Sequence, residues 1–158
     1  MLRRYLLTPV LIAATTSLLA CFSSRGSDLV NQAEELTSEH RYDEAIQTYH
    51  DHIHNRLSNP DRPEWENPYF YLLMIGDIEL LQGDITRALQ DYEEAERQGV
   101  PRNLTSDRYR AVASWYEERQ ELEQSLFILR KYRDRDPLIF DAMLDRVART
   151  LTERENAR

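Results

Sequence analysis

Three histidines at alternate positions, His50, His52 and His54, are the residues whose type and spacing could hold a metal ion. On a helix, His50 and His54 share one face a turn apart, whereas His52 points elsewhere, so the segment offers two imidazole ligands. A catalytic zinc site typically takes three protein ligands, and His40 is the only other histidine in the chain. We therefore expect no metal and no cofactor, with a metal-dependent enzyme as an alternative.

The other residue patterns that support catalysis are missing from the sequence. The four glycines form no phosphate-binding loop, no nucleophile elbow occurs, and the carboxylates are scattered along predicted helix surfaces. The 28 acidic residues outnumber the 20 lysines and arginines, which gives a formal net charge of −8 and argues against nucleic acid as a partner. We expect a protein that is not an enzyme.

The single cysteine, Cys21, follows a segment with the three parts of a secretory signal. Arg3 and Arg4 lie in the first five residues, an apolar stretch covers 6–20, and the small residue Ala20 comes directly before the cysteine. This stretch is shorter than the roughly 20 residues that cross a bilayer. The pattern predicts a signal peptide at 1–20, and a lone cysteine can form no intrachain disulfide.

Leu18, Ala20 and Cys21 resemble the bacterial lipobox, in which the cysteine sulfur accepts a diacylglyceryl group and the cysteine becomes the new N-terminus. The alternative is an ordinary cysteine beside a secretory cleavage site. The resemblance implies a lipoprotein of the bacterial cell envelope, and Phe22 after the cysteine favours the outer membrane, facing the periplasm. The small polar residues that follow predict a lipidated tether at 21–27.

Beyond the tether, apolar residues recur at helical spacing. Gly83 and Gly99 indicate helix ends, and Ser106 can cap the start of another helix. No segment alternates with period two over the length of a strand, so we expect no sheet. Seven helices are predicted, with apolar positions at Leu29, Ala33 and Leu36; Tyr42, Ala45, Ile46, Tyr49 and Ile53; 69–81; Ile85, Ala88, Leu89, Tyr92 and Ala95; Tyr109, Val112, Ala113 and Tyr116; Leu122, Leu126, Leu129 and Tyr132; and Phe140, Met143, Leu144, Val147, Ala148 and Leu151.

The first six predicted helices form three pairs whose sequences align at intervals of 43 and 37 residues. Each pair has a small residue in its first helix and another early in its second, and a larger residue follows one turn later. Small residues at both places let two helices approach closely. The aligned sets are Ala33, Ala45 and Tyr49; Gly76, Ala88 and Tyr92; and Ala113, Ser125 and Leu129.

This arrangement resembles the tetratricopeptide repeat (TPR), which has these small residues, an aromatic one turn later and a proline at the end of each pair. The resemblance implies an all-α fold: a right-handed superhelical stack of about three TPR-like helix hairpins plus a C-terminal capping helix. The helical domain would cover 28–154, with a polar tail at 155–158. Three residues depart from the family pattern: Glu79 at an aromatic position, and His52 and Ser125 at small positions.

The resemblance also implies a concave groove, lined by the first helix of each pair, that holds a peptide or a partner helix. The segment 69–81 is apolar nearly all round, which leaves two readings. Its groove-facing residues form an exposed apolar strip for a partner, or neighbouring helices, a loop or a second copy cover them. On this sequence the partner-binding groove would contain Phe70, Leu73, Asp77, Leu80, Arg110 and Ser114, with Val30, Glu34 and Glu117 beside them.

The segment 55–68 contains three prolines and predicts a loop, either a spacer or an interaction surface, in which Trp65 could dock back on the domain. Together these patterns predict a non-catalytic adaptor for protein–protein interaction, tethered to the membrane by its lipid anchor as part of an envelope assembly. Its expected partner is an envelope protein or peptide. The alternative is a self-associating scaffold, that is, a homo-oligomer.

Overall fold

The computed structural model describes residues 24–157, with side chains from residue 28 on. Seven α-helices and two short 3-10 helices follow one another along the chain, and no strand occurs between 24 and 157, so the predicted all-α class is confirmed. The elements are α1 (Ser24–Ser38), α2 (Tyr42–Leu57), η1 (Pro68–Tyr71), α3 (Leu72–Gln82), α4 (Ile85–Arg97), α5 (Arg102–Glu118), α6 (Leu122–Lys131), η2 (Arg133–Arg135) and α7 (Pro137–Asn156).

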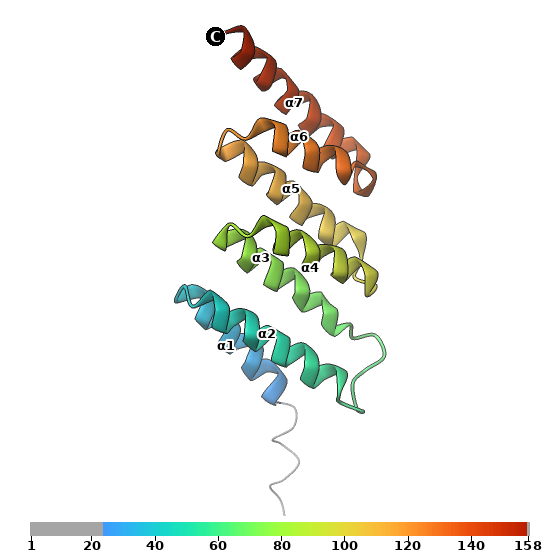
Figure 1. Ribbon diagram of the computed structural model, residues 1–158. Helices are drawn as coiled ribbons and strands as arrows, with labels where there is room; N and C mark the ends of the chain where they lie inside the picture. Colours follow the sequence, from blue (N-terminus) through green and yellow to red (C-terminus); the bar gives the residue numbers. More distant parts are fainter. Residues whose placement is uncertain (1–23, 158) are drawn as a thin grey trace, which may run out of the picture.

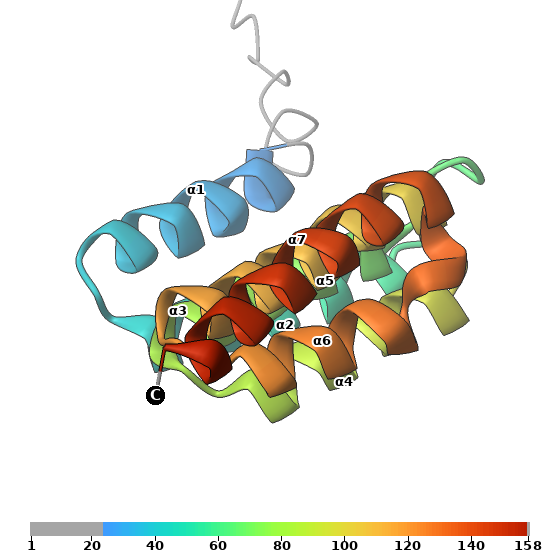
Figure 2. The same cartoon turned by 90° about the horizontal axis from the view of Figure 1, so that it is seen from above.

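The helices pack as three consecutive pairs, α1 with α2, α3 with α4 and α5 with α6, and α7 packs on α6 (Figure 1). Successive helices run in opposite directions, so the stack has two different edges. We call the edge with the tight turns inside the pairs the hairpin edge, on the left in Figure 1. The opposite edge, where segments join one pair to the next, is the linker edge. The view from above shows the same alternation of direction (Figure 2).

The three turns at the hairpin edge share one backbone geometry. In each turn one residue adopts a left-handed conformation, with φ of 61° at His40, 81° at Gly83 and 62° at Gln120. The N–H of the next residue donates to a carbonyl five residues earlier, the bond that closes a Schellman motif. These turns repeat at the same intervals of 43 and 37 residues as the aligned pairs. The three bonds are Arg41 to Leu36, Asp84 to Glu79 and Glu121 to Tyr116, each 2.9 Å long.

The small residues of the aligned pairs lie where two helices approach most closely. A Cβ on Gly76 of α3 would lie 2.4 Å from Cε1 of Tyr92 on α4, so only glycine fits against this ring. All nine aligned residues, from Ala33 to Leu129, are buried. The three departures from the TPR pattern, His52, Glu79 and Ser125, are buried as well.

The helices begin and end at residues that differ from the predicted segments in several places. α1 begins at Ser24, inside the predicted tether 21–27, and α7 continues to Asn156, into the predicted polar tail. Ser106 is a buried residue inside α5 and caps nothing, because α5 already begins after Pro101, whose extended backbone ends the preceding turn. Segment 69–81 is divided in two, since the Asn67 side chain accepts from the N–H of Tyr69 and starts a separate 3-10 turn.

The segment between α2 and η1 is fixed to the stack by polar contacts. Arg56 of α2 forms an ion pair with Glu66, and Arg62 Nη1 donates to the carbonyl oxygen of Glu66 at 2.5 Å. Asn67 Nδ2 donates to the carbonyl oxygen of Gln98, at the end of α4, at 2.9 Å. Trp65 does not dock back on the domain as expected, because 85% of its surface is exposed. A linker held at three points leaves this indole facing solvent.

Candidate partner-binding site

The structure separates the three apolar residues of the predicted groove. Phe70 lies in η1 with 38% of its surface exposed, Leu80 is half-buried, and Leu73 is fully buried. Leu73 is therefore a core residue and a correction to the predicted groove, because the neighbouring helices enclose its side of α3. Of the two readings of this helix, covering by neighbouring elements holds at Leu73, and no continuous apolar strip exists.

The polar residue predicted for the groove, Asp77, lies at the contact between α3 and α5. Its carboxylate accepts from Tyr92 Oη at 2.9 Å and from Arg108 Nη2 at 3.1 Å. The Asp77 side chain remains 42% exposed, so one side of this ion pair faces solvent. Arg108 was not predicted from the sequence, and its contact with Asp77 joins helices 31 residues apart. No local pattern points to such a pair.

The remaining predicted groove positions have mixed surroundings. Arg110 and Ser114 of α5 are half-buried, and Arg110 forms an ion pair with Asp107 one turn earlier. Glu117 is covered by α7, since it accepts from Arg146 Nη2 at 3.0 Å. On α1, Glu34 is exposed, whereas Val30 is half-buried and packs against the core. The part of the predicted groove that can meet a partner is therefore its middle, on η1, α3 and α5.

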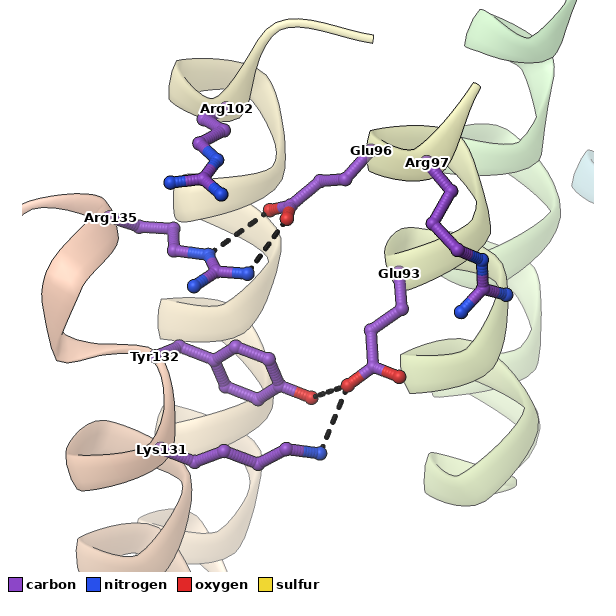
Figure 3. Close-up of a pocket in the computed structure, with 7 residues that line it drawn as sticks. All are labelled: Glu93, Glu96, Arg97, Arg102, Lys131, Tyr132 and Arg135. Atoms are coloured by element: carbon purple, nitrogen blue, oxygen red, sulfur yellow. Dashed lines mark hydrogen bonds and ion pairs between the residues drawn. The ribbon is translucent and has the colours of Figure 1, made fainter. Parts of the chain in front are cut away.

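A cavity of about 510 Å³ opens at the linker edge between the second and third pairs (Figure 3). Four cationic and two anionic side chains line it, and the sequence analysis did not identify any of them as a site. Carboxylates and bases on different helices face one another across the cavity. The lining residues are Glu93, Glu96, Arg97, Arg102, Lys131, Tyr132 and Arg135.

Bonds inside the cavity connect α4 to the third pair. Glu96 accepts from Arg135 Nη2 at 2.8 Å, and both side chains are largely buried. Glu93 accepts from Tyr132 Oη at 2.6 Å and from Lys131 Nζ at 2.9 Å. Burial alone would raise the pKa of Glu93, but the bonds from Tyr132 and Lys131 outweigh burial and hold this pKa below its ordinary value. The paired charges make this cavity a junction between helix pairs.

Two stacked tyrosine rings pack against the charged residues of the junction. Tyr109 of α5 and Tyr132 stack with their ring centroids 3.6 Å apart, and the guanidinium of Arg135 lies 5.7 Å from the Tyr132 ring centroid. Burial raises the pKa of both phenols. Both rings therefore stay neutral at physiological pH and provide an apolar floor with one hydroxyl bonded to Glu93.

A second group of acids lies inside the second pair. Glu79 of α3 is 4% exposed, and its carboxyl faces that of Asp91 on α4. Burial and the charge of Asp91 raise the pKa of Glu79 to about 8. Burial also raises the pKa of Asp91. Two buried carboxyls that face each other resist ionising together. The nearest base is Arg87, whose Nε lies 3.9 Å from Glu79 Oε1.

The histidine segment is a helical surface rather than a cluster. His50 and His54 are exposed on α2, whereas His52 is buried and its ring meets Tyr71 edge-on at a centroid distance of 4.4 Å. Among residues 24–157, no group of three or more metal-binding side chains comes together. Burial of His52 follows from its neighbour Tyr71 in η1, a contact that the sequence analysis missed.

An apolar hollow of about 430 Å³ lies beside the fixed linker, also at the linker edge. Three aromatic side chains line it together with the start of α5, so the exposed indole of Trp65 is not isolated. Glu66 contributes an acid that is already paired with Arg56. The lining residues are Trp65, Glu66, Asn67, Phe70, Tyr71, Val100 and Pro101.

The predicted lipidation site, Cys21, and the signal peptide 1–20 lie outside the described residues 24–157. Within the described part, no helix is both long enough and apolar enough to cross a membrane. No protein-family model matches the chain, and no curated protein matches it.

Proposed function

We propose that this chain is a non-catalytic adaptor, anchored to the bacterial envelope by acylation of Cys21, in which a TPR-like stack holds an envelope protein or peptide. The repeated backbone geometry of the three hairpin turns supports a repeat architecture. In this proposal the pairs form a right-handed superhelical stack, α7 is its capping helix, and η1, α3 and α5 carry the binding surface.

The observation that carries the proposal is the partly exposed Asp77–Arg108 pair between α3 and α5, together with the exposed ring of Phe70 in the 3-10 turn that leads into α3. An apolar anchor and a charged pair on the same stretch of η1 and α3 suit a peptide or helix that buries one side chain and bonds with the pair. Both charges are fixed in place, because Tyr92 and Arg108 both donate to Asp77. A partner would therefore meet a preorganised surface and lose little side-chain entropy.

The test replaces Phe70 with a photo-crosslinking residue in living cells and identifies the adducts by mass spectrometry. We expect one recurrent envelope protein. The matched control carries the same residue at Phe127, which is exposed on α6, away from the proposed surface. The same adduct at both positions would contradict a specific surface. Adducts of the chain with itself at Phe70, together with a doubled mass in light scattering, would support the self-associating scaffold instead.

The lipid anchor is tested separately by Cys21→Ala. This change removes the acyl acceptor, so the protein should move from the membrane fraction to the soluble periplasmic fraction. The control is Ser38→Ala, an exposed position in α1 that has no part in acylation. A Cys21→Ala protein that stays with the membrane, or wild-type protein that takes up no labelled palmitate, would rule out the anchor.

A further inference from the structure

The exposed apolar side chains of the described region are concentrated at the linker edge. The two most exposed are Trp65, at 85%, and Leu138 in the first turn of α7, at 83%. Of seven exposed large apolar residues, five lie at this edge, and Leu81 and Phe127 lie elsewhere (Figure 1). A row of such residues along one side of a molecule indicates a contact surface. The five are Leu57, Trp65, Phe70, Leu138 and Ile139.

Arginine side chains accompany the apolar residues at the same edge. Arg97, Arg102 and Arg133 end α4, begin α5 and begin η2, and each is more than half exposed. A guanidinium donates well to lipid phosphates, and tryptophan prefers the boundary between headgroups and acyl chains. Each of these arginines also has an acidic neighbour, so the contact would depend mainly on apolar insertion.

The length of chain between Cys21 and α1 limits how far this edge can lie from the membrane. α1 begins at Ser24, three residues after the cysteine. Three residues span at most about 10 Å in any conformation. A diacylglyceryl group on Cys21 would lie in the bilayer, so the start of α1 must lie within about that distance of the surface. In Figure 1, α1 begins beneath α2, at the end of the first pair that lies opposite its hairpin turn.

We propose that the linker edge lies on the membrane surface, with the side chains of Trp65 and Leu138 inserted among the lipid headgroups. This inference rests on the proposed acylation of Cys21. The edge contact adds orientation to the anchor, because two apolar contacts far apart along the stack fix its tilt. The hairpin edge then points away from the membrane. Phe70 and the Asp77–Arg108 pair, which form the proposed partner site, are not part of the membrane contact.

The chain provides a matched pair of reporters, since it has two tryptophans. Trp65 lies at the linker edge. Trp115 lies near the end of α5 at the hairpin edge, where its ring is 3.6 Å from the Cβ position at Gly83 and Arg119 covers one face. The Trp115→Phe variant therefore reports the linker edge alone, and Trp65→Phe reports the hairpin edge alone.

Both variants are purified as the full acylated protein and reconstituted into vesicles of phosphatidylethanolamine and phosphatidylglycerol with brominated acyl chains. Bromine quenches an indole that enters the membrane interface. We expect the fluorescence of Trp65 to fall roughly twofold, as for a side chain about 5–10 Å deep, and that of Trp115 to stay constant. Equal quenching of the two tryptophans, or quenching of Trp115 alone, would overturn the proposed orientation.

A second comparison uses charged substitutions that leave the tryptophans in place. Leu138→Glu puts a carboxylate at the proposed interface and should reduce the quenching of Trp65. Leu81→Glu makes the same change at an exposed leucine of the hairpin edge and should leave quenching unchanged. Equal behaviour of the two variants would exclude Leu138 from the contact.

Flotation of the same vesicles distinguishes failure of the anchor from failure of the edge contact. Protein that floats with an unquenched Trp65 is anchored, but the edge contact is wrong. Protein without acyl chains that floats with a quenched Trp65 retains the edge contact, and the proposed anchor is wrong. Protein that does not float at all contradicts both.

Discussion

Acidic side chains on α4 meet opposite surroundings on the two sides of that helix. On the side that faces α3, within the second pair, Asp91 meets the carboxyl of Glu79. On the side that faces the third pair, Glu93 and Glu96 meet Lys131, Tyr132 and Arg135. The same helix therefore faces an acid that resists ionisation on one side and forms favourable ion pairs on the other.

The difference shows what each kind of interface requires. Within a pair, small residues pack against rings, as Gly76 does against Tyr92. This packing does not depend on Glu79 or Asp91. At the junction between pairs, polar bonds from Glu93 on α4 to Lys131 and Tyr132 at the end of α6 join the two sides. We infer that Glu93 and Glu96 stabilise the junction, whereas Glu79 costs stability whenever it is ionised.

The largest expected change in stability comes from breaking the buried ion pair between Arg135 and Glu96 at the junction. Arg135→Met keeps an apolar stem against Tyr132 but leaves Glu96 buried without its guanidinium. We expect the free energy of unfolding to fall by about 3 kcal/mol in urea denaturation at pH 7. The control, Arg133→Met, removes an exposed ion pair and should change nothing measurable. A combined Arg135→Met and Glu96→Gln variant should recover most of the loss, and failure to recover would contradict this explanation.

The next effect depends on pH and comes from Glu79. Its folded-state pKa of about 8 lies above the ordinary value of 4.5, so the folded protein holds a proton that the unfolded chain releases. Stability from this group is full below pH 4.5 and is lost as the pH rises through about 8. The free energy of unfolding should fall by at most about 1.4 kcal/mol per pH unit in this window.

Glu79→Gln mimics the protonated acid and should remove this pH dependence, with a gain of about 2 kcal/mol at pH 9. Thermal and urea unfolding between pH 5 and pH 9 measure both. Glu93→Gln is the matched control on α4, because the pKa of Glu93 is lowered and its stabilising effect is lost only as the pH falls. If the free energy of unfolding of Glu79→Gln falls with pH as steeply as that of the wild type, groups other than Glu79 cause the pH dependence.

A smaller effect is expected from one hydroxyl group at the junction. Tyr132→Phe removes the 2.6 Å bond to Glu93 and should cost about 1 kcal/mol in urea denaturation. Tyr109→Phe, on the ring stacked against it, is the control, since no described residue bonds to its buried hydroxyl. That change should be neutral or slightly stabilising. A larger loss of stability from Tyr109→Phe than from Tyr132→Phe would contradict the proposed role of the Tyr132 hydroxyl.

The smallest effect concerns Arg87, the exposed base nearest to Glu79. Its positive charge lowers the pKa of Glu79, so Arg87→Ala should move the midpoint of the pH-dependent stability loss slightly upward. The same unfolding series measures the midpoint. A downward shift would mean that Arg87 does not act on Glu79 through its charge.

Local patterns in the sequence predicted most of the helices and their pairing. These patterns act over a few residues along the chain: the helical spacing of apolar residues, the turn at Gly83 and the small residue Gly76. The sequence failed where a neighbouring element decides the outcome. Periodicity marks Leu73 as one side of an apolar helix, but only the packing of adjacent helices shows that this side is enclosed. The sequence left open whether Trp65 docks back on the domain, and the structure leaves its indole exposed.

The residues of the candidate surfaces also divide into those that the sequence identified and those that it missed. Phe70 and Asp77 were identified through the aligned repeats, whereas Arg108 and the residues of the junction were not. The sequence by itself determined the all-α class, the three helix pairs and the positions where those helices cross, because these follow from local periodicity and side-chain size. Only the tertiary structure decided which acids meet a base, since partners such as Glu93 and Lys131 are 38 residues apart and come together through packing alone.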